Sequence, residues 1–271
     1  MIADWWASTA EIRRANPHSI DRAIALGRRA DRFGAAFFGG YTSAITALDQ
    51  SITGIGALCA TEEGGGHPRA IQTTLADGLL NGTKHFVSGG TLATDLLVVA
   101  KIGERDGRPE LKVARIKANA SGVKLEDGLV LDFVPEIPHG AVTFSNARVD
   151  AVLEGDGYER YLKPFRTIED LHVFGAIAAC LVANGAAQAT AERLEATLAA
   201  IRHLARQSPS SPETHIALAG VLALARETIA AMDLSGFSEE FRTRFERDKP
   251  LLKIAEKVRE QRRVKAWSEK K

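Results

Sequence analysis

Hydrophobic residues follow three successive patterns along the chain. In residues 1–53 they recur three and four positions apart, as in IDRAIALGRRADRFGAAFF, and this spacing predicts helices. In residues 54–153 they form short runs such as DLLVVAKI and ELKVARI, separated by turn residues such as ERDGRP, which predicts strands. In residues 154–271 the helical spacing returns. These boundaries predict an N-terminal helical segment, a middle β domain and a C-terminal helical bundle.

The middle region has no helix long enough to connect parallel strands. We therefore expect an antiparallel β-barrel or sandwich there, rather than a doubly wound parallel sheet. Glycines are expected to interrupt the helices at Gly39-Gly40 and at Gly175 or Gly185. A later helix is expected to begin at the Ser-Pro-Glu of residues 211–213. The predicted fold class is α+β with several domains, in which the C-terminal helices form an antiparallel bundle.

Composition and charge restrict the partners. The 271 residues are 45% hydrophobic, and 35 basic residues nearly balance 34 acidic ones, so no long-range field attracts nucleic acid or a membrane. The longest apolar run, residues 174–183, is too short to span a bilayer. Cys59 and Cys180 lie in apolar runs, which is typical of buried thiols in a reducing compartment. We therefore expect a cytoplasmic protein without nucleic-acid or membrane partners.

One segment departs from this charge balance. Residues 241–271 carry twelve basic and five acidic residues, a net charge of +7. Such a segment can bind nucleic acid or an acidic cofactor. Leu251, Ile254 and Val258 recur at helical spacing, however, and we favour an amphipathic helix with a solvated basic face.

The common motifs of nucleotide, metal and acyl-transfer sites are absent from the sequence. The glycine run of residues 64–66 is followed by His-Pro and lacks the GxxxxGK[ST] pattern of a phosphate loop. GIGALC, at residues 54–59, lacks the third glycine of a dinucleotide fingerprint. The histidines and cysteines form no HxxxH, HExxH or CxxC pair, so we expect no metal site. No GxSxG elbow occurs either.

Three motifs occur together in a fixed order: TEEGGGHP, then NGTKHFVSGG, then VTFSNARVDAVLEGDGY. In order and spacing they resemble the middle domain of the acyl-CoA dehydrogenase family, over about residues 50 to 205. The resemblance implies a flavoprotein of fatty acid metabolism that oxidises an acyl-CoA thioester at its α and β carbons. It also implies hydride transfer to FAD, and a homodimer or homotetramer.

The resemblance also implies roles for individual residues. Thr61 matches a threonine that hydrogen-bonds the polar edge of the flavin, and Phe86 matches an aromatic residue against the isoalloxazine. Val87 and Ser88 match the next two residues, beside the reactive centre. Glu169 falls where a minority of the family carries the catalytic base. The alternative from local sequence is that the first four are ordinary strand and loop residues, and that Glu169 complements a helix dipole.

Departures from the family pattern leave other functions open. His67-Pro68 replaces the usual Ser-Asp after the loop glycine, and Asp170 replaces an arginine. The QxxGGxGY segment that helps to hold the FAD adenosine has no counterpart. FMN or no flavin are therefore alternatives to FAD. The functional alternatives are a catalytically degenerate binding or assembly protein, and a flavin-dependent monooxygenase on the same fold.

Overall fold

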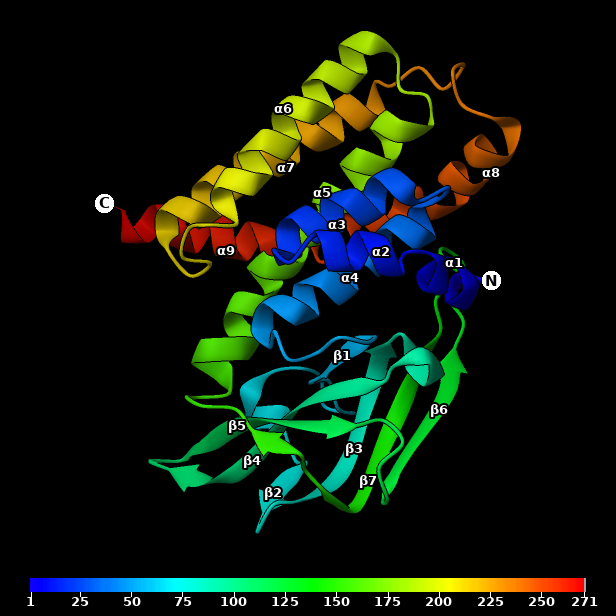
Figure 1. Cartoon of the computed structure of the whole chain (residues 1–271). Helices are drawn as coiled ribbons and strands as arrows, with labels where there is room; N and C mark the ends of the chain where they lie inside the picture. The colour runs from blue at the N-terminus through cyan, green and yellow to red at the C-terminus, as the bar shows by residue number, and fades with distance from the viewer. Residues whose placement is uncertain (271) are drawn as a thin grey trace. The chain divides into compact units, whose positions relative to one another are not determined.

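A computed structural model describes residues 1–270, and the elements follow the predicted order of helices, strands and helices (Figure 1). The chain divides into two compact units. The helical unit comprises Met1–Ala47, Asp132–Glu136 and Arg166–Lys271. The β unit comprises Leu48–Leu131 and Ile137–Phe165. None of the helices in the described part of the chain is both long and apolar enough to cross a membrane.

The α-helices are α1 (Ile2–Ser8), α2 (Ala10–Ala15), α3 (Ser19–Arg29), α4 (Phe33–Leu48), α5 (Lys163–Asn184), α6 (Gln188–Leu204), α7 (Pro212–Ala230), α8 (Glu239–Asp248) and α9 (Glu256–Glu269). The predicted start of α7 is confirmed: Pro212 occupies its first position, and the Ser211 hydroxyl accepts a hydrogen bond from the Thr214 amide at 3.2 Å. Ser238 caps α8 in the same way.

Helix α5 forms the centre of the helical unit, and every residue from 170 to 180 is buried. Glycines bring α3 and α4 close to it. A Cβ on Gly27 would lie 2.2 Å from the Ala176 carbonyl oxygen, and one on Gly40 would lie 2.8 Å from Val173 Cα. The expected interruption at Gly39-Gly40 is therefore wrong, because α4 continues through both residues. Glycine is required at both positions because the neighbouring helices leave no room for a side chain, not because the chain turns there.

The helical run after residue 163 divides at Gly185, one of the two expected positions. Gly185 has φ +134°, and a Cβ there would lie 2.3 Å from the Gly236 carbonyl oxygen. Gly175 stays within α5. Helices α6 and α7 then run side by side (Figure 1).

The β unit is built on one eight-stranded sheet in which β6, β7, β3, β2, β4, β5 and β8 are successive neighbours and β1 pairs with β4. The strands are β1 (Gly56–Cys59), β2 (Thr74–Ala76), β3 (Leu79–Ser88), β4 (Asp95–Arg105), β5 (Arg108–Lys117), β6 (Val123–Leu129), β7 (His139–Arg148) and β8 (Ala151–Val152). The predicted antiparallel character holds for the long pairs β3–β7, β4–β5 and β6–β7. Short β1 and β2 pair with β4 in parallel.

Candidate functional site

The glycine run of residues 64–66 forms a tight turn. Two hydrogen bonds close it, from the Glu62 amide to the Gly65 carbonyl (3.1 Å) and from the Gly65 amide to the Glu62 carbonyl (2.8 Å). Gly65 has φ +96°, a conformation that favours glycine. The local turn therefore accounts for the glycine at this position, and no phosphate contact is needed to explain it.

A buried ion pair fixes this turn to β3. Lys84 is fully buried, and its Nζ lies 2.6 Å from Glu62 Oε1. The Glu62 carboxylate also accepts hydrogen bonds from the amides of Gln72 (2.7 Å) and Thr73 (3.0 Å). Burial lowers the pKa of Lys84, and Glu62 opposes that shift. Burial alone would raise the pKa of Glu62, but the bonds from Lys84 and the two amides lower it. The contacts of Glu62 thus favour its charged carboxylate, and that charge opposes loss of the Lys84 proton.

Phe86 stands out on β3 because its aromatic side chain faces solvent. The register between β3 and β7 shifts between Lys84 and Val87, and Phe86 in this bulge has φ +55°. Its side chain is 60% exposed, the largest exposure of any phenylalanine in the described chain. A bulky residue at positive φ is strained, and such strain is concentrated at functional sites. The bulge thus presents an aromatic ring on the surface of the β unit.

The other residues predicted for the flavin site, Thr61, Val87 and Ser88, are linked to Phe86 along β3 or by a backbone hydrogen bond. The Thr61 carbonyl accepts a hydrogen bond from the His85 amide at 2.8 Å, which joins the loop to the bulge. Thr61 and Ser88 are half-buried, and Ser88 is paired with His139 across the sheet. The Val87 side chain is fully buried, so only its main chain is available to a ligand. We call the surface formed by Thr61, Phe86, Val87 and Ser88 the β3 wall.

A second feature of the β unit was not predicted from the sequence. A cavity of about 880 Å³ lies between the short helix η1 (Pro68–Ala70), the β4–β5 hairpin and the segment around Tyr158. Both basic and acidic side chains line it: Arg69, Arg105, Asp106, Arg108, Glu110, Asp156 and Glu159. Arg105 pairs with Glu110 at 2.6 Å, whereas neither Arg69 nor Arg108 forms an ion pair within residues 1–270. The only sequence feature that pointed to this cavity was the turn ERDGRP, which contains two arginines.

In the helical unit, Glu169 is a carboxylate without a partner. It lies half-buried near the start of α5, and within the described residues it accepts no hydrogen bond and forms no ion pair. Burial raises the pKa of Glu169 to about 7, and the neighbouring Asp170 adds to the shift, while Arg166 and Arg259 oppose it. A carboxylate with such a pKa is suited to general-base chemistry near neutral pH.

Asp170, the next residue, has a structural role. Its two oxygens accept hydrogen bonds from Arg259 Nε (2.8 Å) and Arg262 Nη2 (2.6 Å), both on α9. Arg262 also reaches the Thr167 hydroxyl at 3.2 Å. The prediction of one amphipathic helix across the basic C-terminal segment is therefore wrong. The segment divides into α8, the short helix η4 (Lys249–Lys253) and α9, and Ile254, expected on the apolar face, is 45% exposed between the last two. Two arginines of α9 point inward to α5 rather than to solvent.

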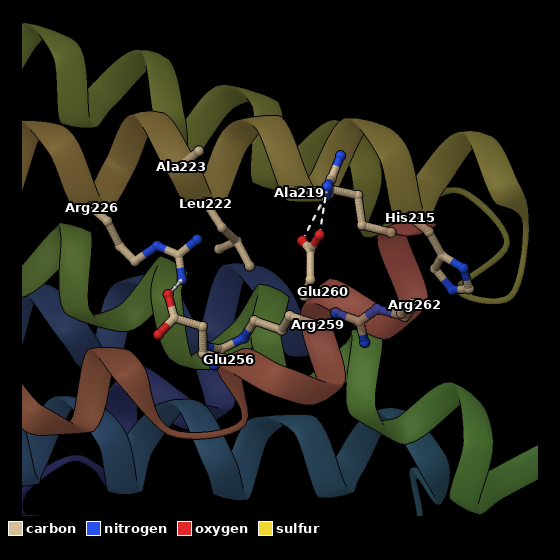
Figure 2. Close-up of a pocket in the computed structure, with 10 residues that line it drawn as sticks. His215, Ala219, Leu222, Ala223, Arg226, Glu256, Arg259, Glu260 and Arg262 are labelled. Carbon is tan, nitrogen blue, oxygen red and sulfur yellow. Dashed lines mark hydrogen bonds and ion pairs between the residues drawn. The ribbon is translucent and has the colours of Figure 1, made fainter. Parts of the chain in front are cut away.

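Figure 2 shows how α9 faces α7 across a cavity of about 210 Å³. Arg226 of α7 points toward Glu256 of α9, with 3.5 Å between Nη1 and Oε1. Arg263 and Glu260 pair on α9 itself at 2.5 Å. The charged groups that line this cavity are thus paired with one another or with Asp170, and the pairs of Glu256, Arg259 and Arg262 join α9 to α7 and α5.

Comparison with known proteins identifies the fold. The chain matches no protein-family model and no curated protein sequence. It is similar to the solved structure of butyryl-CoA dehydrogenase from Megasphaera elsdenii (TM-score 0.65, 16% identity, 92% of this chain and 81% of that one). A probable acyl-CoA dehydrogenase from Mycobacterium abscessus gives a TM-score of 0.65 at 16% identity, over 97% and 90% of the two chains. An FAD complex of PigA gives 0.63 at 15%, over 98% and 94%.

These similarities confirm the predicted fold class, because acyl-CoA dehydrogenases share the chain's order of helices, curled sheet and helices. The chain therefore has the acyl-CoA dehydrogenase fold. A fold hosts many chemistries, so the reaction has to be argued from the residues.

Proposed function

We propose that the protein is an FAD-dependent dehydrogenase that oxidises an acyl-CoA thioester at its α and β carbons. The exposed, strained Phe86 on the β3 bulge carries this proposal. A flat cofactor needs an apolar face with a few fixed polar groups beside it. The β3 wall offers a phenyl ring with half-buried Ser88 two positions further along β3, and half-buried Thr61 hydrogen-bonded through its carbonyl to the neighbouring His85 amide.

Each residue then has a defined task. Phe86, the Thr61 hydroxyl and the backbone of residues 87–88 would hold the flavin. When bound, FAD supplies the hydride acceptor. Glu169 removes the proton α to the thioester carbonyl, for which its unpartnered, desolvated carboxylate is suited. In the β-unit cavity, Arg69 and Arg108 form no ion pair within residues 1–270 and would be the contacts for an anionic group such as the nucleotide of CoA, in a lining where four acids outnumber three arginines.

The first experiment asks whether flavin binds at the β3 wall. We expect purified protein to show flavin absorbance near ~450 nm, and Phe86→Ala to lose most of the bound flavin because the stacking surface is gone. Ile102→Ala, which removes another exposed apolar side chain from the β unit, is the matched control and should keep it. Colourless protein that takes up neither added FAD nor FMN would refute the proposal.

The second experiment separates dehydrogenation from oxygenation. Anaerobic addition of acyl-CoA should bleach the flavin, since no oxygen is required. Glu169→Gln should abolish bleaching while the flavin stays bound, because only the proton acceptor is removed. Bleaching that persists in the variant would remove Glu169 from the mechanism. Flavin that responds to substrate only with oxygen would instead support a monooxygenase.

A protein without catalytic activity is the second candidate, and His67 favours it. In the family pattern a serine stands near this position, but here His67 Nδ1 accepts the Arg69 amide at 3.2 Å and caps η1. The His67 side chain therefore makes its hydrogen bond within its own loop. A colourless protein that still binds acyl-CoA would support a binding or assembly role.

A further inference from the structure

A groove in the helical unit has no role in the proposed reaction. Its volume is about 510 Å³, and it lies where the end of α7, helix α8 and the short helix η4 (Lys249–Lys253) meet. Its lining is mainly apolar: Ile229, Ala230, Met232, Leu234, Phe245, Pro250 and Leu252. The floor is well supported, since Phe245 packs edge-on against Phe33 with ring centroids 5.1 Å apart.

Three cations surround this apolar floor. Arg226, Lys249 and Lys253 line the groove together with a single acid, Glu246. Glu246 pairs with Lys249, and the nearest carboxylate to Arg226 is Glu256 at 3.5 Å. Lys253 is exposed and forms no ion pair within residues 1–270. The rim therefore keeps an excess of positive charge beside an apolar recess.

We propose that this groove binds a long-chain carboxylate, with its alkyl chain on the apolar floor and its carboxylate paired with Lys253. The volume falls within the range of small-molecule sites, about 300–1,000 Å³. The charge of the rim selects an anion over a neutral or cationic amphiphile. A partner helix fits less well, because it needs a groove that takes side chains along several helical turns, whereas this lining comes from the end of α7 and the loop after it, the end of α8 and the short η4.

The test measures binding of octanoate, decanoate and dodecanoate by calorimetry, below their micelle concentrations. Each added CH₂ group should tighten binding about threefold to fourfold, as expected for burial of a methylene group. Dodecanol should bind more weakly than dodecanoate, because it lacks the charge. Lys253→Glu should weaken dodecanoate on the order of tenfold, since a charge-assisted contact becomes a repulsion. Lys270→Glu, the same charge change on an exposed lysine of the helical unit, should have little effect.

A second pair of variants tests the floor. Ala230→Trp fills the groove from an exposed position, so folding should survive while dodecanoate binding is lost. Ala196→Trp, on an exposed position of α6 away from the groove, should leave binding unchanged.

Three results would overturn the proposal. The first is equal binding of dodecanol and dodecanoate. The second is an equal loss of dodecanoate affinity in Lys253→Glu and Lys270→Glu. The third is a sedimentation mass that changes in Ala230→Trp while dodecanoate binding does not. The last result would make the groove a contact between copies of the chain. None of these measurements needs flavin, so failure here would leave the flavin proposal standing, and the reverse.

Discussion

At the scale of single residues, the Glu62–Lys84 pair is the contact whose loss should be most damaging in the β unit. Glu62→Gln would leave the fully buried Lys84 charge with only a neutral amide and the Ala60 carbonyl, 3.4 Å away. Removing one partner of a buried ion pair costs about 3–5 kcal/mol. Urea unfolding measures this loss. Glu110→Gln, which breaks the exposed Arg105–Glu110 pair, should cost no more than about 1 kcal/mol.

The double variant Glu62→Gln/Lys84→Met should recover much of the loss, because no buried charge is then unpaired. The pH dependence has a defined sign. Burial raises and hydrogen bonds lower the pKa of Glu62, and the net shift is downward. Its contribution is therefore present above its unfolded pKa of about 4.3 and is lost as pH falls through the lower folded value. A loss in Glu62→Gln as small as that in Glu110→Gln would contradict this role.

Glu169 should affect stability with the opposite sign. Burial raises the folded-state pKa of Glu169 to about 7, above the unfolded value of about 4.3. The folded state thus holds the proton more tightly, and wild-type stability should fall as pH rises between these values. Glu169→Gln lacks this carboxyl group, so its stability relative to wild type should increase from pH 5 to pH 8. Urea unfolding at both values measures the difference.

The control is Glu227→Gln, the same substitution at an exposed glutamate of α7. If Glu169→Gln behaved like that control, Glu169 would not be desolvated, and its use as a base near neutral pH would lose its physical reason. This measurement is independent of flavin and substrate.

At the scale of the elements, we expect substitution by alanine to change the stability in opposite directions at two helical glycines. Gly27 of α3 has no room for a methyl group, because the Ala176 carbonyl of α5 would lie 2.2 Å from its Cβ. Gly27→Ala should destabilise the protein by about 1–3 kcal/mol through overpacking. Gly220 of α7 has nothing within 4 Å, and Gly220→Ala should stabilise by about 0.5–1 kcal/mol. Thermal unfolding compares both, and a stabilising Gly27→Ala would show that α3 and α5 are not in contact.

The same glycines show what the sequence could and could not predict. Hydrophobic spacing predicted the helices and strands, and Ser-Pro-Glu predicted the start of α7, because these signals act between near neighbours in the chain. The predicted interruption at Gly40 was wrong, because glycine is required there by contact with α5, which lies more than a hundred residues away in the chain. The exposure of Phe86 depends on a bulge set by pairing with β7, and the charged cavity with Arg69 depends on segments joined only by folding.

At the scale of the whole molecule, a homodimer or homotetramer is a further proposal, and exposed apolar residues of α9 make it testable. Val264 and Trp267 are 54% and 48% exposed and lie three positions apart, on one side of the helix. Exposed aromatic residues are enriched in interfaces between subunits. We expect sedimentation to give a multiple of the 29.2 kDa chain mass, and Trp267→Glu to lower that multiple. Ile102→Glu, an equally drastic change at an exposed position of the β unit, should not.

Tryptophan fluorescence gives the same prediction a second readout. The other two tryptophans, Trp5 and Trp6, are each only 9% exposed, so Trp267 dominates any change in solvent contact. If α9 lies in an interface, dilution should shift the emission to longer wavelength as Trp267 becomes hydrated. Emission that stays constant across dilution, while sedimentation shows dissociation, would place the interface on another surface. A mass of a single chain at every concentration would contradict the oligomer itself.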